Sequence, residues 1–270
     1  MQIKIRYAEQ RDVRRIVEIV KQGFDKVLLE AMIYGCQGID KYLSYQFKLP
    51  RNLSDKVYIV AENSDGVIGF VEFRIYPDML FLNYIGIEKR ARKNGLASYL
   101  LSQSELIIRK KCHEKMQLDV FFDNQVSKNW YEKIGFTSIA SSNWLSVSFK
   151  AESRLNNSKV SGFPQAILCN KEFGFSEFTL NTPIDTYNIG LLGDKWFRVT
   201  QSQIFHDSDA LSGLKKLSGT RKILVLCNDE DLDNIPSHAE HFCRPIRMNI
   251  SLDKFEKEIL LKFKDKSNDF

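Results

Sequence analysis

Four cationic side chains crowd into five residues just ahead of a glycine and an apolar helical pattern. In the stretch EKRARKNGLASYLL these are Lys89, Arg90, Arg92 and Lys93, and the glycine is Gly95. The unpaired N–H groups at the start of a helix and the helix macrodipole both favour an anion there. Glycine also lets the backbone approach a bulky anion. The spacing therefore predicts a phosphate-binding loop.

The charge distribution places the anionic ligand in the first part of the chain. Residues 1–150 hold 23 Lys/Arg and 17 Asp/Glu, whereas residues 151–270 hold 16 and 17. Such a surplus indicates an anionic ligand, or serves solubility alone. The P-loop pattern GxxxxGK[ST] and the dinucleotide pattern GxGxxG are both absent. Nucleic acid is a rival ligand, but no stacking-aromatic or zinc module accompanies the basic loop.

A strand must lead into this loop and a helix must follow it. The stretch LFLNYIGI is typical of a strand, and KMQLDVFFD predicts another strand after the helix. This order predicts a crossover around the helix. The helix is expected from about Gly95 to Lys111, with a buried face formed by Leu96, Leu100, Leu101, Ile107 and Ile108.

The flanking segments predict a mixed α/β domain over residues 1–150. IKIRYA indicates a first strand, and EQRDVRRIVEIVKQGF an amphipathic helix. Two β-rich runs flank Asn63-Ser64-Asp65-Gly66, a strong hairpin signal. NQVSKNWYEKIGF predicts a short helix and WLSVSFK a final strand.

Three stretches resemble a known family. IGIEKRARKNGLASYLL resembles motif A of the GNAT superfamily of acyl-CoA N-acyltransferases, [Q/R]-x-x-G-x-[G/A], read here from Arg92 to Ala97. Lys93 departs from the glycine that the family often has. IRYAEQRDVRRIVEIV resembles the family's first strand and helix. NQVSKNWYEKIGF resembles its closing motif, with Ser127 where alanine is usual. The resemblance covers about residues 1–150.

The resemblance implies a GNAT fold that binds acetyl-CoA. The strand backbone around Ile85 and Ile87 would contact pantetheine, the amides from Arg92 to Ala97 would hold the diphosphate, and Asn124 would bond the pantetheine arm. The full set assigned to the cosubstrate is Ile85, Ile87, Arg92, Lys93, Asn94, Gly95, Leu96, Ala97, Asn124 and Ser127.

The same resemblance implies the catalytic groups. Tyr131 matches the family's general acid. A hydroxyl with a pKa of about 10 can protonate a thiolate whose conjugate acid has a pKa of about 8.5. Glu72, in GFVEFRIY, is the best-placed base by order, and ordered water is the alternative. The helical spacing puts Asn124, Ser127 and Tyr131 on one face and predicts an opposite, core-facing stripe of Val126, Trp130 and Ile134.

Residues 151–270 resemble no family that we can name and are expected to form a smaller α/β accessory domain. AESRLNNSKV, at 151–160, is typical of a linker. KWFRVTQ, DSDALSGLKKLSG and RKILVLCN predict a βαβ unit. The closing helix SLDKFEKEILLKF places Leu252, Phe255, Ile259 and Phe263 on one face. This domain is expected to shape the acceptor site or to mediate dimerisation.

Composition narrows the class of protein. The five cysteines form no CxxC pair, which is typical of reduced thiols in a cytoplasmic protein. There is no run of eighteen apolar residues and no secretory stretch, so no membrane association is expected. His238, His241 and Cys243 cluster, but a fourth zinc ligand is not evident, and no metal is predicted.

The leading hypothesis is an acetyl-CoA-dependent N-acetyltransferase with direct transfer to an amine. A longer acyl donor is a variation within this class. The alternative is a non-catalytic module that binds acyl-CoA as a sensor or partner platform. The sequence leaves the acceptor amine and a homodimer open.

Overall fold

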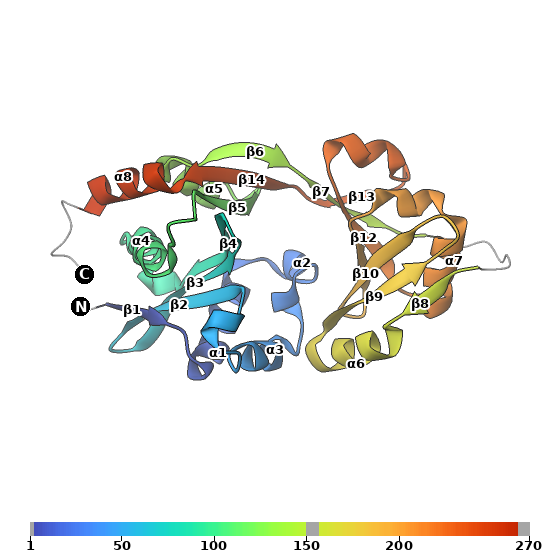
Figure 1. Cartoon of the computed structure of the whole chain (residues 1–270), viewed down its shortest axis with the longest axis horizontal. Helices are drawn as coiled ribbons and strands as arrows, with labels where there is room; N and C mark the ends of the chain where they lie inside the picture. Colours follow the sequence, from blue (N-terminus) through green and yellow to red (C-terminus); the bar gives the residue numbers. More distant parts are fainter. Residues whose placement is uncertain (1–2, 150–156, 264–270) are drawn as a thin grey trace. The chain divides into compact units, whose positions relative to one another are not determined.

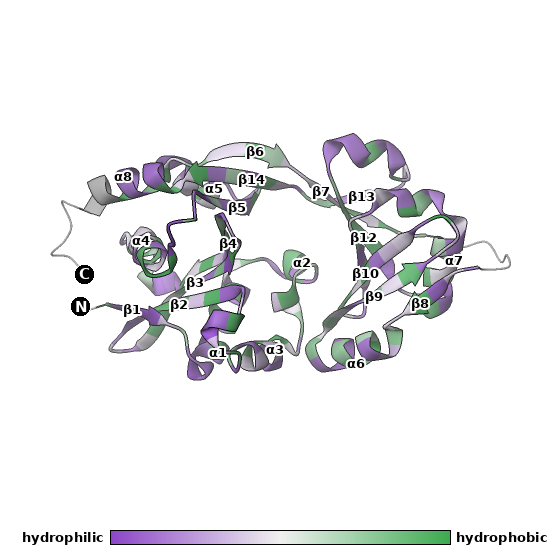
Figure 2. Ribbon diagram, in the orientation of Figure 1, coloured by the Kyte–Doolittle hydropathy of each residue, from purple (hydrophilic) through white to green (hydrophobic). Residues whose placement is uncertain are grey.

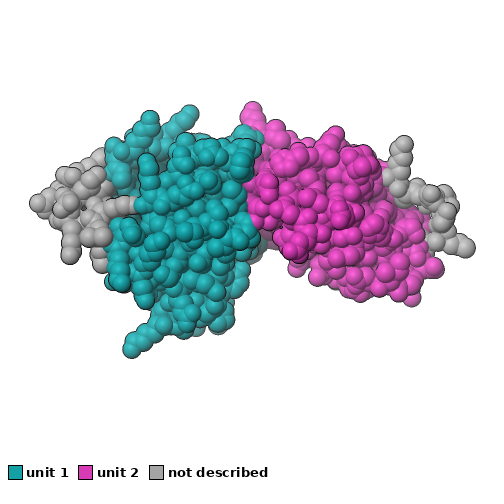
Figure 3. Space-filling view, turned by 90° about the horizontal axis from the view of Figure 1, so that it is seen from above, with its two compact units in different colours: residues 1–25, 42–140, 246–270 teal, residues 26–41, 141–245 magenta. Residues whose placement is uncertain are grey.

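The computed structural model describes residues 3–149 and 157–263, with side chains as far as residue 259. The chain divides into two compact units, shown in Figure 3. Unit 1 comprises residues 1–25, 42–140 and 246–270, and unit 2 comprises residues 26–41 and 141–245. Most of the predicted linker at 151–160 falls outside the described residues. Across the described ranges, every helix is too short or too polar to cross a membrane.

Unit 1 contains a mixed seven-stranded sheet in the order β1-β2-β3-β4-β5-β14-β6 (Figure 1). β1 to β4 are antiparallel neighbours, and β4 runs parallel to β5. The strands are β1 (Lys4–Tyr7), β2 (Lys56–Asn63), β3 (Gly66–Ile75), β4 (Met79–Ile87), β5 (Lys115–Phe121), β6 (Thr137–Ser141) and β14 (Pro245–Ser251). The helices are α1 (Val13–Gly23), α3 (Ile39–Gln46, where the division between the units falls), α4 (Leu96–Ile108), α5 (Gln125–Ile134) and α8 (Leu252–Phe263), with 3-10 turns η1 (Gln10–Asp12), η3 (Arg51–Leu53) and η4 (Lys89–Ala91). A mixed α/β class was predicted and is confirmed.

The predicted hairpin between β2 and β3 is present. Gly66 has φ of 109°, a left-handed conformation that glycine adopts without a Cβ clash. The Asp65 N–H donates to Asn63 Oδ1 at 2.9 Å, and Asn63 pairs with Gly66 across the turn. Short-range turn chemistry therefore sets this register.

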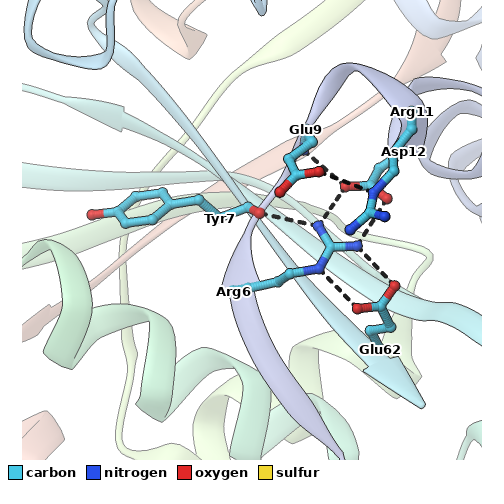
Figure 4. Close-up of polar contacts among 6 residues, drawn as sticks. All are labelled: Arg6, Tyr7, Glu9, Arg11, Asp12 and Glu62. Carbon is cyan, nitrogen blue, oxygen red and sulfur yellow. Dashed lines mark hydrogen bonds and ion pairs between the residues drawn. The ribbon is translucent and has the colours of Figure 1, made fainter. Parts of the chain in front are cut away.

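One arginine joins the first strand to its neighbours (Figure 4). Arg6 donates to both oxygens of Glu62 at 2.9 Å and to both oxygens of Asp12, at 2.7 and 3.0 Å. Its remaining bond, at 3.1 Å, goes to the Tyr7 carbonyl. All of the N–H donors of the guanidinium are thereby satisfied, which a lysine could not reproduce. The stretch IRYAEQRD thus holds β1, β2 and the start of α1 together.

The buried face of α4 differs from the predicted one at its end. Leu96, Leu100, Leu101 and Ile108 are buried, but Ile107 is 39% exposed and Glu105 only 2% exposed. The helical repeat alone does not explain this, because Ile107 follows the buried Leu100 by two turns; at its end the helix buries the side of Leu101, Glu105 and Ile108 instead. A charged residue on the buried face could not be read from an apolar pattern.

The predicted core stripe of α5 is confirmed at Ile134 and wrong at Val126. Val126 is 83% exposed and Trp130 is half-buried, whereas Tyr131 and Ile134 lie in the core. Tyr131 packs edge-on against Phe136, with ring centroids 5.6 Å apart. The helix therefore turns the face of Tyr131, rather than that of Val126, toward the core.

Unit 2 contains a second seven-stranded sheet in the order β13-β7-β12-β11-β10-β9-β8. β11 and β12 are parallel, and α7 connects them, so the predicted βαβ unit is confirmed. The strands are β7 (Asn143–Val147), β8 (Lys159–Ser161), β9 (Phe175–Asn181), β10 (Thr186–Leu192), β11 (Trp196–Val199), β12 (Lys222–Cys227) and β13 (Glu240–Cys243). The helices are α2 (Lys26–Leu29), α6 (Phe163–Phe173) and α7 (Ser208–Leu217), with 3-10 turns η2 (Ile33–Gly35), η5 (Ser202–His206) and η6 (Asp229–Asn234).

Helices in both units mix hydrophilic and hydrophobic residues along their length, as α6 and α8 show in Figure 2. In the closing helix α8, Leu252, Phe255 and Ile259 share the buried face and join the core of unit 1. Phe263, predicted on the same face, has a side chain outside the described residues. The apolar stripe of this helix was thus predicted well as far as it is described.

The predicted domain boundary at residue 150 does not coincide with the division between the two units of the structure. β7, predicted as the last strand of the first domain, pairs with β12 and β13 in the second sheet. β14, from the far end of the chain, lies between β5 and β6 in the first sheet, and α8 follows it into unit 1. Strand pairing between segments so distant in sequence leaves no local signal.

Candidate active site

The parallel strands β4 and β5 of unit 1 pair over only the first half of their length and then diverge. They pair in parallel from Met79 to Leu82 and from Lys115 to Leu118. β4 then runs on to Ile87 and β5 to Phe121. A shift in the pairing of β3 with β4, at Asn83, accompanies this divergence. The bulge bends β4, so the strand continues with one backbone edge not taken up by β5.

The free edge of β4 belongs to Ile85 and Ile87. The Glu88 N–H donates to Ile68 O of β3 at 2.8 Å, so Glu88 faces β3. Because backbone groups alternate along a strand, those of Ile85 and Ile87 face the other way, toward the space that β5 has left. Arg92 Nε, which donates to Ile87 O at 2.9 Å, confirms that direction. The N–H and C=O of Ile85 and the N–H of Ile87 therefore line this space.

The loop after β4 holds two residues in left-handed conformations. Lys93 has φ of 70° and Gly95 has φ of 79°. Among the described residues Lys93 is the one non-glycine residue with positive φ. Such a conformation costs a side-chain-bearing residue about 1–2 kcal/mol. The loop thus keeps a strained shape at the position where the family often has glycine, as functional loops tend to do.

The first turn of α4 presents unused N–H groups. The first helical bond runs from Tyr99 N–H to Gly95 O at 3.0 Å, and no side chain caps the helix. The amides of Leu96 and Ala97 precede that bond and have no acceptor within the helix. The buried Leu96 side chain fixes the helix start, while Arg92, Lys93, Asn94 and Gly95 are exposed. Amides, macrodipole and exposed cations together suit an anion.

The acidic residue before the loop is internally neutralised. Glu88 accepts from Arg15 at 2.6 Å and from Arg90 at 2.9 Å. Burial acts to raise the pKa of Glu88, but the bonds from Arg15 and Arg90 hold it below its ordinary value. Lys89, Arg92 and Lys93 are exposed, as is Arg90, whose charge is paired with Glu88.

Tyr131 lies in α5 with its ring in the core. Its side chain is 7% exposed, and the hydroxyl has no hydrogen-bond partner among the described residues. Burial raises the pKa of Tyr131 above its ordinary value, so the hydroxyl carries its proton throughout the neutral pH range. A buried, protonated hydroxyl without a protein acceptor can serve as a proton donor.

Asn124 and Ser127 form the start of α5. Asn124 is the N-cap, and its Oδ1 accepts from the Ser127 N–H at 3.1 Å. Gly135 ends the same helix with φ of 108°. The cap uses only Oδ1, so the Nδ2 group stays available for a ligand. Asn124 therefore has a structural role that the sequence analysis did not assign to it.

A contact that the sequence analysis missed joins α5 to α4. Trp130 Nε1 donates to Ser98 Oγ at 3.0 Å. Ser98 lies in the first turn of α4, directly after Ala97. Trp130 had been assigned to a core stripe, and no pattern in the sequence pairs it with a serine 32 residues away.

Glu72 is almost fully buried, at 2% exposure. It lies in β3 between Tyr58 of β2 and Tyr84 of β4, its cross-strand partners. Asn83 Nδ2, at the bulge, donates to Glu72 Oε1 at 2.6 Å. A base in this position reaches an amine only through a relay of water or hydrogen bonds.

One face of the sheet is less covered from β4 onward. The face toward α4 and α8 is buried at Leu80, Leu82, Leu118 and Met248. The alternate residues, facing the other way, remain partly exposed: Phe81, Tyr84, Gln117, Asp119, Arg247 and Asn249.

β14 contributes two polar residues to this open face. Arg247 binds both oxygens of Asp119 in a two-pronged ion pair, and Gln117 Nε2 donates to Asn249 Oδ1 at 3.4 Å. The hydrogen bonds to Asp119 raise the pKa of Arg247 above its ordinary value. Sequence reasoning could not find these residues, because they enter the sheet from the end of the chain.

The cluster of His238, His241 and Cys243 lies in and before β13, where His238 contacts the backbone. His238 Nε2 lies 2.8 Å from Ser148 O. Over residues 3–149 and 157–263, no group of three or more His, Cys, Asp or Glu side chains could hold a metal ion.

Comparison with known proteins finds one family model that matches part of the chain. Residues 29–136 match the family model described as acetyltransferase (GNAT) family. A comparison with curated proteins returned no match. A putative acetyltransferase from Pyrococcus horikoshii superposes with a TM-score of 0.61 at 15% identity, over 92% of this chain and 89% of that one.

Two further solved structures share the fold along most of the chain. A tandem GNAT protein from the clavulanic acid biosynthesis pathway gives a TM-score of 0.61 at 8% identity, over 93% of this chain and 98% of that one. A GCN5-related N-acetyltransferase from Sphaerobacter thermophilus gives 0.59 at 10% identity, over 93% and 96%. At these identities the likeness shows the fold alone. Residues 29–136 therefore match the GNAT acetyltransferase family model, and the chain as a whole shares its fold with tandem GNAT proteins.

Proposed function

We propose that the chain is an acetyl-CoA-dependent N-acetyltransferase whose site lies in unit 1. The observation that carries this proposal is the free edge of β4 leading into the uncapped start of α4. Ile85 and Ile87 offer backbone groups to an amide-bearing arm, as a neighbouring strand would. The Arg92 N–H donates to Lys89 O at 3.5 Å, so the amides from Lys93 to Ala97, together with the adjacent cations, suit a diphosphate at the end of that arm.

The residues present fit the cosubstrate, which supplies an activated acetyl group. The N–H groups of the β4 edge can polarise the thioester carbonyl. Tyr131 holds a proton for the departing sulfur. Asn124 Nδ2 and the Ser127 hydroxyl are further polar groups for the arm. Glu72, held by the hydrogen bond from Asn83 Nδ2, takes the proton of the amine through water, the base role that we assign to it.

The acceptor amine is proposed to approach the open face of β4, β5 and β14. That face carries aromatic rings, with Phe24 edge-on to Tyr84 at 6.4 Å and to Phe121 at 6.2 Å. Arg247 and Asn249 lie on the same face, so β14 is the part of the C-terminal sequence that we expect to shape the acceptor site.

Tyr131→Phe tests the catalytic assignment. Loss of the acid is expected to lower turnover about a hundredfold, because general acid catalysis contributes on that order. The affinity for acetyl-CoA should change little, since the ring that packs against Phe136 is retained. Thiol release from acetyl-CoA on a panel of primary amines measures the first quantity, and calorimetric titration with CoA the second.

Two outcomes would revise this proposal. Equal turnover in wild type and Tyr131→Phe would remove Tyr131 as the acid. Stabilisation of the wild type by CoA without thiol release on any amine would favour the non-catalytic sensor instead.

A further inference from the structure

Tyr131 and the diphosphate loop must keep a fixed separation for the reaction to proceed. The pantetheine arm has a constant covalent length, so it sets how far the sulfur lies from the diphosphate. A proton donor for that sulfur is useful only if its distance from the diphosphate-binding amides matches the arm. An error of about 1 Å in such placement can cost about a hundredfold in rate.

A direct polar contact bridges the two parts of the site. Trp130 Nε1, in α5, donates to Ser98 Oγ, in the first turn of α4, at 3.0 Å. Indole has this single donor, and Ser98 follows Ala97, the last residue of the proposed diphosphate loop. Trp130 also contacts Tyr131, with ring centroids 4.7 Å apart and ring planes at 48°. Loop, serine, tryptophan and tyrosine thus form one continuous chain of contacts.

The other anchors of α5 act on different features of the helix. Asn124 and Gly135 fix where the helix begins and ends, and Ile134 fixes the face that enters the core. None of these three side-chain or backbone features sets the distance between α5 and the start of α4. The Trp130 indole does set it, because its hydrogen bond to Ser98 is short and directional.

We propose that the hydrogen bond from Trp130 to Ser98 is a positioning contact that sets the place of the Tyr131 hydroxyl relative to the coenzyme diphosphate. This inference rests on the proposed function. Neither side chain touches reacting atoms; both act through Tyr131. Breaking the contact should therefore lower turnover and leave the binding of CoA almost intact, because the backbone N–H of Ser98 and its neighbours remain.

Single and double variants test this coupling. Ser98→Ala and Trp130→Phe are each expected to lower kcat about tenfold with acetyl-CoA and the best primary amine of a panel. The double variant should also lose about tenfold rather than a hundredfold, because both changes break the same contact. The dissociation constant for CoA should stay within about twofold of wild type, since a uniform binding contact is not lost.

Two controls separate positioning from general damage. Ser102→Ala removes a buried hydroxyl one turn along the same helix, where Ser102 Oγ donates to Tyr99 O at 2.8 Å, without touching α5. Its kcat should match wild type. Ser98→Thr keeps a hydroxyl acceptor and should recover most of the activity lost in Ser98→Ala. An unchanged kcat in Ser98→Ala, or losses that multiply in the double variant, would overturn the proposal.

A spectroscopic readout distinguishes failure of this inference from failure of the proposed function. The full chain has three tryptophans, so indole ¹⁵N labelling gives three resonances, and Trp130→Phe assigns one of them. That resonance is expected to move in Ser98→Ala and on addition of CoA. If CoA moves no resonance and does not bind in calorimetry, the proposed function falls and the positioning role with it. If CoA binds and amines turn over at equal rates in wild type and Ser98→Ala, only the positioning role falls.

Discussion

The two units build the same parallel crossover with connections of equal length and opposite character. In unit 1, residues 88–95 join β4 to α4, and in unit 2, residues 200–207 join β11 to α7. The first connection, EKRARKNG, has four cations and one carboxylate, a net charge of +3. The second, TQSQIFHD, has one carboxylate and no Lys or Arg, a net charge of −1 with His neutral.

The helix starts differ in the same way. α4 begins at Gly95 without a side-chain cap. α7 begins at Asp207, which is 1% exposed and whose Oδ1 accepts from the Ala210 N–H at 3.0 Å. Asp207 Oδ2 accepts from Thr182 Oγ1 at 2.6 Å and from the Tyr187 hydroxyl at 3.2 Å.

The comparison shows how the same crossover topology can give either a helix start capped by the chain itself or one open to a ligand. A carboxylate of the chain itself occupies the start of α7, where the backbone amides favour negative charge. No side-chain carboxylate caps the start of α4, so its backbone amides are available to an external anion. We infer that unit 1 binds the coenzyme and that unit 2 does not.

Gly95→Val alters the uncapped start of α4 and is expected to have the largest effect, which is on CoA affinity. A β-branched residue in the left-handed conformation, together with its bulk beside the amides, should weaken CoA binding by about a hundredfold or more. Calorimetric titration with CoA measures this loss. Gly162→Val, at the N-cap of α6 with φ of 73°, is a matched strain control in unit 2 and should leave CoA affinity unaltered.

Asp207→Ala attacks the closed helix start. The variant loses an N-cap and leaves the Tyr187 and Thr182 hydroxyls without their acceptor, so the free energy of unfolding should fall by about 3 kcal/mol. Asp207→Asn keeps an oxygen for the cap and should lose about half as much. Urea denaturation reports both values, and CoA affinity should be unchanged in either variant. A fully stable Asp207→Ala would contradict the role that we give to this carboxylate.

Glu105→Gln extends the comparison of the two helices. The buried carboxyl of α7, Asp207, lies at the start of its helix, whereas that of α4, Glu105, lies near the C-terminal end. Burial is the main cause that raises the pKa of Glu105 to about 7, with Glu256 adding to it and Arg109 opposing. The folded state therefore holds the proton more tightly than the unfolded chain. The stability that this provides is present below about pH 4.5 and is lost as the pH rises toward 7.

Removal of this charge should therefore help at high pH. At pH 8, Glu105→Gln is expected to exceed wild type in free energy of unfolding by about 2 kcal/mol. At pH 5 the two should differ little. Urea denaturation at both pH values tests this, and a gap that is the same at pH 5 and pH 8 would be inconsistent with a titrating Glu105.

Lys93→Gly probes the strained loop and has the smallest expected effect. Glycine adopts positive φ freely, so Lys93→Gly should be more stable than Lys93→Ala by about 1 kcal/mol. Both variants lose the same cation, so both should show the same modest loss of CoA affinity and a weaker dependence on salt. If alanine were tolerated as well as glycine, the left-handed conformation at this position would be in doubt.

Local patterns in the sequence predicted the strand, loop and helix around Gly95 well. The cation cluster, the glycine and the apolar repeat all act within a few residues, so their physics is visible in the sequence. The hairpin at Gly66 and the crossover of β11, α7 and β12 were predictable for the same reason. Tyr131 was selected through its motif, and its catalytic role stays a prediction; the face of its helix was misjudged.

Contacts between distant segments could not be predicted. β14 enters the first sheet from the end of the chain, so neither the domain boundary nor Arg247 on the open face had a local signal. Asp207 is an ordinary helix cap in the sequence, and only the fold brings Thr182 and Tyr187 to it. Glu105 breaks the apolar pattern of a buried face, a choice that depends on its tertiary neighbours.

The most direct test of this account is the stoichiometry of CoA binding to the full chain by calorimetry. We expect one CoA per chain, lost in Gly95→Val and retained in Asp207→Ala. Two CoA molecules per chain, or binding that survives Gly95→Val, would contradict the claim that the start of α4 holds the coenzyme and the start of α7 does not.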